Sequence, residues 1–576
     1  MPKLDWIGKK AVVNHHREVP FHLLRNNEEL SVGDPGSGNL LVQGDNLVAL
    51  KALLPYYAGQ VKCIYIDPPY NTGNEGWVYN DNVNSPEMKE WLGRTVGKEA
   101  EDLSRHDKWL CMMYPRLALL REFLRDDGAI FISIDDNEYA NLCLLIREIF
   151  GEQNEVATLV WEKGKKGDSK LVSETHEYIL IFARNKGYLT SSNIKWRKRK
   201  AGVDEVLQYY ADLRASLGND HNSIRQAMMS WYRSLEKKDP RKAHKHYNWS
   251  DDRGLYFPDN FHGPDDGREN RPRYDIIHPI TGKSCAKPST GWRWDEKTTK
   301  LALAEKPPRI HFGKDETTIP NRKSYLAEVV QEPLMSVFYK DGRAATLEVE
   351  GILGAGAFPF PKDSDLLAEL IGVVADDYDI VMDSFAGSGT TGHAVIKLNQ
   401  AVGGSRKFIL VEMDLEVCLT KTRARLEKAV VGYTYIPKKG KPSFIGALGG
   451  GFRYCELGEP LFDERGNIRS TVSFADLARH VYFTETGEPL PAGADSVSPL
   501  LAIHNGTAVY LLYNGILKDK TIRGGNVLTT TILAALPSHD GPRVIYGAAC
   551  RLDHERMRRE GIVFKQLPYK LKVGVV

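Results

Sequence analysis

Two short stretches of the sequence carry residue types that can do chemistry, and the first is Asp67-Pro68-Pro69-Tyr70. It directly follows the apolar run Cys63–Ile66, which has the composition of a buried strand. Each proline fixes φ and lacks an amide donor, so the chain leaves the strand as a stiff, extended loop. Such a loop presents a carboxylate, a carbonyl and a ring to a flat, amino-bearing substrate. A strand that simply ends in a proline turn is the alternative.

The second stretch is a glycine-rich turn, Asp383-Ser-Phe-Ala-Gly-Ser-Gly-Thr-Thr-Gly392. The glycines match the dinucleotide fingerprint, and Glu412 follows after about 20 residues, where a ribose-binding acid is expected. Spacing alone therefore favours a nicotinamide or flavin cofactor, whereas the absence of Gly-Lys-Ser/Thr excludes a Walker loop. S-adenosylmethionine needs the same ribose acid but carries no pyrophosphate. The loop at Asp67 favours this cofactor, because hydride transfer needs no acceptors aimed at a planar amine.

Alternating strands and helices are predicted to position both stretches. The two sequence halves each follow a strand-helix pattern, which predicts one α/β, doubly wound sheet assembled from both halves. Strands are expected at 40–45, 62–66, 129–134, 378–382 and 408–412, with helices at 46–54, 116–124, 138–150, 393–399 and 420–430, and a late antiparallel strand at 177–182.

Composition restricts the class of protein. The 576 residues are 42% hydrophobic and 26% charged, as in globular enzymes, and the net charge of +2 means that affinity for polyanions must come from local patches. The seven cysteines form no CxxC pair, which favours reduced thiols and no metal site. The sequence has no signal peptide and no apolar run of membrane-spanning length. We therefore expect a cytoplasmic protein that does not associate with membranes.

Basic residues interleaved with aromatic ones are concentrated between the two halves, in residues 186–345. Such runs suit phosphate contact combined with base stacking, although solvated surface is the alternative for any single run. The candidate DNA-binding residues are Lys195, Arg197, Lys198, Arg199, Lys200, Arg241, Lys242, Trp292 and Arg293. His244 and His246 are interpreted as surface residues or phosphate neighbours, because no further metal ligands accompany them.

The order of these motifs resembles the β group of DNA amino-methyltransferases, in which the Asp-Pro-Pro-Tyr loop comes first, a recognition insert follows and the glycine turn comes last. The resemblance covers about residues 40–430 and includes Gln43–Leu47, Met113–Leu117, Ile132–Asp136 and Phe360–Lys362. Pro361-Lys362-Asp363 departs from the usual Pro-Lys-Pro of that family. The insert, with His278–Gly282 and Gly291–Trp294, and the C-terminal region resemble modification subunits of Type III restriction–modification systems.

The resemblance implies a Rossmann-like, S-adenosylmethionine-dependent methyltransferase fold in four parts. These are a catalytic half at 1–185, a DNA target-recognition insert at 186–345, a cofactor-binding half at 346–436 and, past a linker, a small α/β interaction module at 437–576. The expected reaction transfers a methyl group to N6 of an adenine flipped out of duplex DNA, in a restriction–modification or phage-defence system. Expected partners are double-stranded DNA, a second copy of the chain and a restriction helicase/nuclease subunit.

The resemblance also assigns residue roles. Asp67 and Pro68 accept hydrogen bonds from the target amine, Pro69 stiffens the loop, and Tyr70 stacks on the base. The cofactor is expected at Asp45, Lys362, Asp383, Phe385, Gly387, Gly389, Thr390 and Glu412, with Glu412 on the ribose, Asp45 at the adenine edge and Lys362 at the carboxylate. Two alternatives are an N4-cytosine methyltransferase and a DNA-binding specificity subunit with a vestigial methyl-transfer site.

Overall fold

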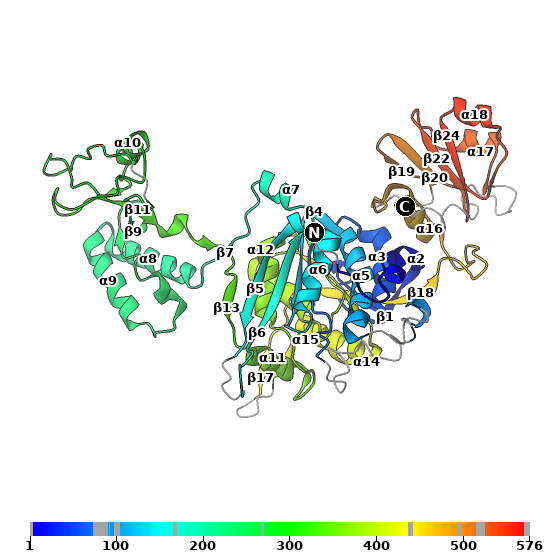
Figure 1. Cartoon of the computed structure of the whole chain (residues 1–576), viewed down its shortest axis with the longest axis horizontal. Helices are drawn as coiled ribbons and strands as arrows, with labels where there is room; N and C mark the ends of the chain where they lie inside the picture. Colours follow the sequence, from blue (N-terminus) through cyan, green and yellow to red (C-terminus); the bar gives the residue numbers. More distant parts are fainter. Residues whose placement is uncertain are drawn as a thin grey trace. The chain divides into compact units, whose positions relative to one another are not determined.

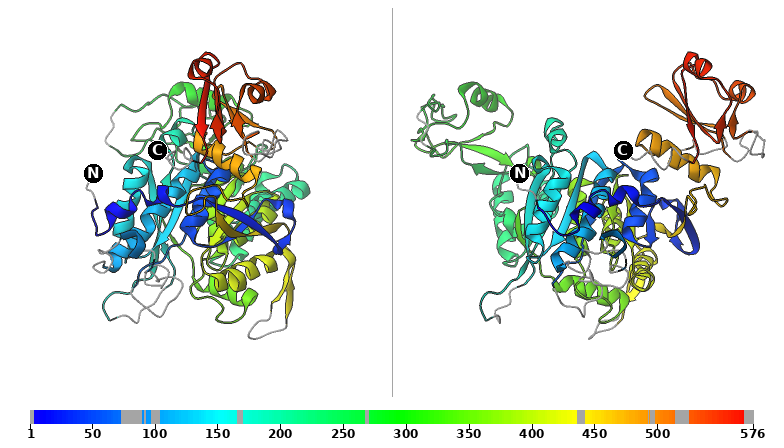
Figure 2. Two further views of the ribbon diagram at one scale, coloured as in Figure 1. Left: turned by 90° about the vertical axis from the view of Figure 1, so that its right-hand side faces the viewer. Right: turned by 45° about the vertical axis from the view of Figure 1, so that its right-hand side comes forward.

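The computed structural model divides into two compact units (Figures 1 and 2). Unit 1 comprises Met1–Lys195 and Met335–Val576, and unit 2 comprises Trp196–Leu334. The structure describes residues 4–72, 90, 93–96, 104–164, 170–266, 270–435, 442–491, 493, 498–513 and 525–568. Unit 1 contains both chemical stretches. Unit 2 is shorter than the insert expected at 186–345, because residues 186–195 and 335–345 belong to unit 1.

A ten-stranded sheet forms the centre of unit 1. Its strands lie in the order β1 (His22–Gly33), β18 (Gly451–Pro460), β2 (Leu40–Gln43), β15 (Lys407–Glu412), β14 (Ile380–Asp383), β3 (Val61–Ile66), β4 (Leu124–Ile134), β6 (His176–Ala183), β5 (Glu155–Glu162) and β13 (Val337–Tyr339). The five strands from β2 to β4 pair in parallel, and β6 runs antiparallel to β4. The predicted doubly wound α/β fold and the late antiparallel strand are confirmed.

The two sequence halves meet where β14 pairs with β3. Met382 lies opposite Ile64, so the segments that follow the two strands leave the sheet at the same edge. All six residues of β3 are buried, as expected for a parallel strand covered on both faces. The junction therefore brings Asp67 and Asp383 to neighbouring strand ends, where open α/β sheets bind ligands.

Helices cover both faces of this sheet. Figure 2, left, shows one group in blue and cyan and another in yellow-green on opposite sides of the strands. The first group consists of α3 (Asn46–Tyr57), α5 (Arg105–Phe123) and α6 (Tyr139–Phe150), and the second includes α11 (Arg343–Leu353), α12 (Ser364–Val374), α13 (Thr390–Val402) and α15 (Ala424–Val431).

Helix α5 begins earlier than its sequence pattern predicts. We expected a helix after Pro115, but the capping box of Ser104 and Asp107 begins it at Arg105, and Pro115 lies inside. A proline inside a helix removes one backbone hydrogen bond. The helix continues through it, and the preceding side chains from Trp109 to Met113 are all buried, which stabilises the extra turns.

The C-terminal region differs from the expectation of a separate module that begins at 437. Strand β18 lies inside the main sheet, parallel to β2 and antiparallel to β1. Phe452 and Tyr454 are fully buried there, so the sheet needs this strand to cover its edge. The smaller α/β part begins only after β18. It contains α16 (Phe474–Thr486) and a sheet of β19 (Leu500–His504), β20 (Thr507–Leu511), β22 (Arg543–Gly547) and β24 (Ile562–Gln566).

The described part of unit 2 contains three α-helices, among them α10 (Glu296–Ala304), together with a small sheet and long connections. The other two helices are α8 (Val203–Leu217) and α9 (His221–Ser234), and the sheet has the order β10 (Ile310–His311), β11 (Asn321–Tyr325), β9 (Leu255–Asp259) and β8 (Trp249–Ser250). One apolar cluster joins α8 and α9 to β9, and a second contains Phe261, Ile276, Trp292 and Ile310. The basic insert thus has a core of its own.

Candidate active site

The loop after β3 is held by tertiary hydrogen bonds as well as by its prolines. The indole of Trp109 on α5 donates to the carbonyl oxygen of Pro69 at 2.6 Å. Asn71 has a left-handed φ of 58° and is buried, and its amide donates to the carboxylate of Glu138, which is 0% exposed. These contacts fix the loop at both ends of Tyr70, so its conformation is set before any substrate arrives.

A buried ion network surrounds the Asp67 carboxylate. The Lys362 side chain is 5% exposed, and its Nζ lies 2.9 Å from Asp67 Oδ1 and 3.4 Å from Glu177 Oε2. The same Nζ lies 4.8 Å from the centre of the Tyr70 ring. Glu177 also accepts from the Tyr70 hydroxyl at 3.3 Å and pairs with Lys163. Two carboxylates and two ammonium groups therefore lie beside the ring.

Lys362, Glu177 and Tyr70 keep their ordinary charge states. Burial alone would lower the pKa of Lys362, but the carboxylates of Asp67 and Glu177 raise it above the usual value. Burial would likewise raise the pKa of Glu177, but Lys362 and Lys163 lower it. Burial and then the neighbouring carboxylates raise the pKa of Tyr70 well above its usual range, so the phenol stays neutral. Lys362 and Glu177 therefore form an ion pair beside an uncharged ring.

Sequence reasoning missed Glu177 and Lys163. The predicted antiparallel strand at 177–182 contained a usable signal. An antiparallel strand begins at the edge where its parallel neighbour ends, and Tyr178 indeed lies opposite Ile134, the last residue of β4. A carboxylate at the start of that strand therefore lies on the catalytic edge of the sheet. Lys163 follows the end of β5 at the same edge.

The glycine turn after β14 is organised by two buried carboxylates. Asp383 accepts from the amide of Phe385 at 2.9 Å and from the Thr391 hydroxyl at 2.5 Å. Glu412, at the end of β15, accepts from the amide of Gly387 at 2.9 Å. Burial raises the pKa of Asp383 to about 7. The turn thus places the Glu412 carboxylate, 3% exposed, directly against the glycine backbone.

The turn needs glycine at two positions. Gly387 and Gly389 have φ values of 54° and 77°, in the left-handed region that side chains disfavour. A Cβ on Gly389 would also lie 3.2 Å from the carbonyl oxygen of Thr422, which is tighter than an ordinary contact. The spacing identified in the sequence therefore reflects backbone geometry.

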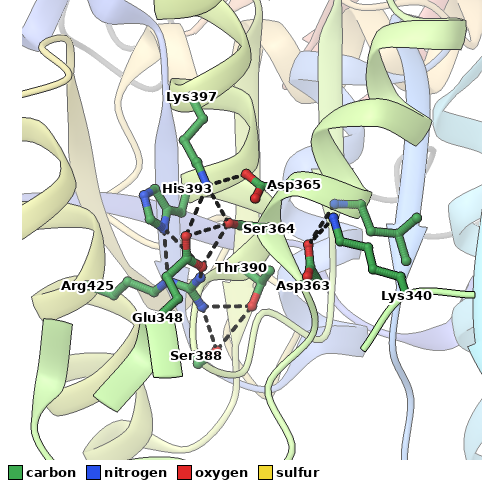
Figure 3. Close-up of polar contacts among 11 residues, drawn as sticks. Lys340, Glu348, Asp363, Ser364, Asp365, Ser388, Thr390, His393, Lys397 and Arg425 are labelled. Carbon is green, nitrogen blue, oxygen red and sulfur yellow. Dashed lines mark hydrogen bonds and ion pairs between the residues drawn. The ribbon is translucent and has the colours of Figure 1, made fainter. Parts of the chain in front are cut away.

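A buried arginine supports the turn from behind (Figure 3). Arg425 of α15 is fully buried and donates to Ser388 Oγ at 3.0 Å and to Thr390 Oγ1 at 2.8 Å. Its second terminal nitrogen, Nη2, donates to Glu348 of α11 at 2.7 Å. Around this pair lie His393, Ser364 and Lys397. Sequence reasoning missed Arg425, although Thr422, Leu426 and Ala429 place it on the buried stripe of its helix.

The start of α3 is joined to the glycine turn. Asp45 is the N-cap of α3 and accepts from the amides of Leu47 and Val48 at 2.9 and 3.1 Å. The next residue, Asn46, donates to the carbonyl oxygen of Ser384 at 3.2 Å. Ser384 Oγ is itself buried and has no hydrogen-bond partner among the described residues. The predicted cofactor residue Asp45 thus lies at a helix start that contacts the turn.

The two stretches line one small pocket. Asp67, Lys362, Phe385, Gly387 and Thr390 are among its lining residues, and its free volume is about 20 Å³. The segment Phe358–Lys362 covers the turn in this arrangement. Near this pocket, the buried acid Glu412 lies against the Gly387 backbone, and the turn also supplies the Phe385 ring and the unpartnered Ser384 hydroxyl. These groups fit an adenosine-bearing cofactor.

Most predicted DNA-binding residues lie in unit 2, but several are already paired there. Arg199 pairs with Asp204, Arg241 pairs with Asp239 at 2.6 Å, and Lys198 lies 3.8 Å from Glu332. Lys242 donates to the carbonyl oxygen of Leu235 at 2.7 Å. Lys195, the last residue before unit 2, Arg197 and Arg293 are exposed, and Lys200 is half-buried.

Two predictions about the insert are wrong. Trp292 was expected to contact DNA, but its side chain is 0% exposed and its indole donates to the carbonyl oxygen of Tyr274 at 2.8 Å. It is a core residue, because Phe261 and Tyr274 pack around it. His244, interpreted as a surface residue, is buried, with Nε2 2.9 Å from the Ala201 carbonyl oxygen.

Within the described ranges, no group of three or more His, Cys, Asp or Glu side chains could hold a metal ion. In the same part of the chain, no helix combines the length and apolarity that a membrane crossing needs.

A family model described as DNA methylase matches residues 61–422. Among curated proteins, the Type III restriction-modification enzyme EcoP15I Mod subunit of Escherichia coli is 37% identical over 71% of this chain and 64% of its own length. The EcoPI Mod subunit of Escherichia phage P1 is 32% identical over 73% of this chain and 64% of its own length. The Type II methyltransferase M.KpnI of Klebsiella pneumoniae is 28% identical over 69% and 84%.

The chain spans about 64% of the length of the two Mod subunits above. Among solved structures, the PvuII DNA methyltransferase, described as cytosine-N4-specific, matches with 12% identity and a TM-score of 0.31, over 67% of this chain and 86% of that one.

Proposed function

The chain belongs to the DNA methylase family, and we propose that it transfers a methyl group from S-adenosylmethionine to N6 of an adenine in duplex DNA. The observation that carries this proposal is the pocket shared by the Asp67 loop and the glycine turn, at the ends of two neighbouring parallel strands. The similarity to Mod subunits supports a role as the modification part of a Type III restriction–modification system.

The exocyclic amine of adenine is a poor nucleophile because its lone pair is delocalised into the ring. The Asp67 carboxylate and the Pro68 carbonyl accept hydrogen bonds from the two N6 hydrogens, which helps the nitrogen towards tetrahedral geometry. The N6 lone pair then forms the bond to the methyl carbon, the sulfur–carbon bond breaks with its electron pair on sulfur, and one N6 proton leaves to solvent. The protein contributes positioning and electrostatic stabilisation, and no covalent enzyme intermediate forms.

The cofactor supplies an electrophilic methyl group, and the residues of the glycine turn hold it. Glu412 accepts hydrogen bonds from the ribose hydroxyls, while Gly387 and Gly389 allow close backbone approach. Asp45 and Phe385 contact the adenine of the cofactor. Asp383 and Thr390 shape the turn through the bonds described above.

The target base must leave the duplex, which costs a few kcal/mol. Stacking on the Tyr70 ring returns about 1–3 kcal/mol. The exposed basic residues Arg197 and Arg293 of unit 2, together with Lys195 and Lys200, are the candidates for phosphate contact. We further propose that the protein acts in the cytoplasm as a homodimer and associates with a restriction helicase/nuclease subunit.

Single-molecule sequencing of DNA from a host that expresses the protein tests the reaction, since it reads the modified base and its sequence context together. We expect N6-methyladenine within one recognition sequence. N4-methylcytosine instead would identify a cytosine enzyme. Unmodified DNA from a protein that binds S-adenosylmethionine in vitro would indicate a specificity subunit with a vestigial site.

A further inference from the structure

Lys362 contacts both groups that the proposed function assigns to the target adenine. Its ammonium lies 2.9 Å from Asp67 Oδ1, which must accept from the target amine, and 4.8 Å from the centre of the Tyr70 ring, on which the base must stack. A protonated amine beside a carboxylate and above an aromatic face is the arrangement that the amino group and ring of a flipped adenine would replace. Lys362 and the base therefore compete for the same position, beside the Asp67 carboxylate and over the Tyr70 ring.

The backbone of Lys362 is fixed by the residue that follows it. Asp363 is the N-cap of α12, since it accepts from the amide of Leu366 at 2.8 Å, and it also pairs with Lys340 at 2.8 Å (Figure 3). A proline at 363 would provide neither the cap nor the ion pair. Because this anchor is independent of Asp67, the side chain of Lys362 can change partner without unfolding the segment.

Glu177 is the alternative partner. Its Oε2 lies 3.4 Å from the Lys362 ammonium, which is already within ion-pair distance. Lys163 and the Tyr70 hydroxyl hold the Glu177 carboxylate in position. The ammonium can therefore move from Asp67 to Glu177 without entering water, and the Asp67 carboxylate then accepts a hydrogen bond from the entering amine instead.

We propose that Lys362 occupies the place of the target amine at Asp67 while the base pocket is empty and shifts to Glu177 when the adenine enters. Lys362 is then a positioning residue for Asp67 and Tyr70, and it does not bind the carboxylate of the cofactor. Glu177 is the residue that receives it. The inference rests on the proposed function, because it takes Asp67 and Tyr70 as the groups that receive the base.

The variant Lys362→Met separates the two roles of this lysine, because it keeps the aliphatic volume and removes the charge. We expect the Kd for S-adenosylmethionine, measured by isothermal titration calorimetry, to stay within about twofold of wild type. The kcat at saturating cofactor is expected to fall by up to about 100-fold, because without Lys362 the empty site no longer holds Asp67 in the position that receives the amine. A Kd weakened by about tenfold or more, with kcat at saturation unchanged, would instead assign Lys362 to the cofactor and overturn the inference.

Glu177→Gln tests the receiving position. The fluorescence of 2-aminopurine at the target position reports base entry, and we expect Glu177→Gln to reduce this signal and kcat together while the cofactor Kd is unchanged. Base entry and kcat equal to wild type would overturn the role of Glu177. The control matched to Lys362→Met is Lys62→Met. Lys62 is another buried lysine, which lies on β3 and pairs with Asp127 at 2.6 Å. Its cofactor Kd, kcat and 2-aminopurine signal should equal those of wild type.

The two proposals fail in different ways. If wild-type protein binds S-adenosylmethionine but methylates no adenine, the proposed function is wrong. In that case the cofactor Kd of Lys362→Met still decides whether Lys362 binds the cofactor.

Discussion

The Asp67 loop and the glycine turn lie at the ends of neighbouring strands, yet they are supported in different ways. The Asp67 carboxylate pairs with a charged side chain that lines the pocket, Lys362, which pairs in turn with Glu177. The glycine turn is held from behind by Arg425, which is fully buried. The Asp67 loop receives a new hydrogen-bond partner in each reaction cycle, so the side chain that pairs with it must be able to change partner. A turn that only binds a cofactor is better served by supports that stay in place.

The largest effect is expected at the acceptor side. Asp67→Ala removes the carboxylate that accepts from the target amine, and we expect kcat to fall by about 1,000-fold. DNA binding and its salt dependence should persist, because the basic residues of unit 2 supply it. Filter binding across a salt series measures the second quantity. If methyl transfer and DNA binding disappear together, the loop is structural, and the contrast with the turn is lost.

At the turn, the effect should appear in cofactor affinity. Arg425→Lys removes the planar fork that joins Ser388, Thr390 and Glu348. We expect the Kd for S-adenosylmethionine to rise by about 10- to 100-fold, or about 1.4–2.8 kcal/mol, with little change in kcat at saturating cofactor. A cavity of about 540 Å³ borders Glu348, so the side chains at positions 348 and 425 have room to rearrange in this variant.

Arg406→Lys is the matched control for that variant. Arg406 is also largely buried, at 9% exposure, and pairs with Asp377 at 2.9 Å in the same half of the sheet. A cofactor Kd within twofold of wild type in Arg425→Lys, or equal losses in the two variants, would remove any special role of Arg425.

The pH dependence of stability should report the burial of Asp383, the last residue of β14. Burial raises the pKa of Asp383 to about 7, above the ordinary value of 3.8, so the folded state favours the neutral form. The stability linked to this group is therefore full below about pH 4 and is lost as pH rises towards 7, by up to about 4 kcal/mol. We expect the thermal midpoint of Asp383→Asn, relative to wild type, to increase from pH 5 to pH 8. A constant difference would contradict the raised pKa.

The smallest effect is expected at the hydroxyl of Tyr70. Tyr70→Phe removes a 3.3 Å hydrogen bond to Glu177 but keeps the ring, so base entry should change by about 0.5 kcal/mol. Tyr70→Ala removes the stacking surface and should weaken base entry by about 1–3 kcal/mol. The fluorescence of 2-aminopurine at the target position measures both variants. Equal losses would show that the hydroxyl, and not the ring, receives the base.

The sequence by itself determined the local chemistry of both stretches. Proline at 68 and 69 stiffens a strand end, and glycine at 387 and 389 permits left-handed φ, because backbone dihedral preferences depend on the residue and its immediate neighbours. Strand and helix periodicity then predicted that two distant halves share one sheet, and the pairing of β14 with β3 confirmed it.

Only the tertiary structure decided with which partners the charged and aromatic side chains are buried. Lys362 lies beside Asp67 and Glu177, Arg425 lies beneath the turn, and Trp292 belongs to a core. Strand β18 likewise joins the main sheet. The physical reason is common to all four. Burial and ion pairing depend on which remote segments cover a residue, and no local pattern around a lysine, an arginine or a tryptophan records that covering segment.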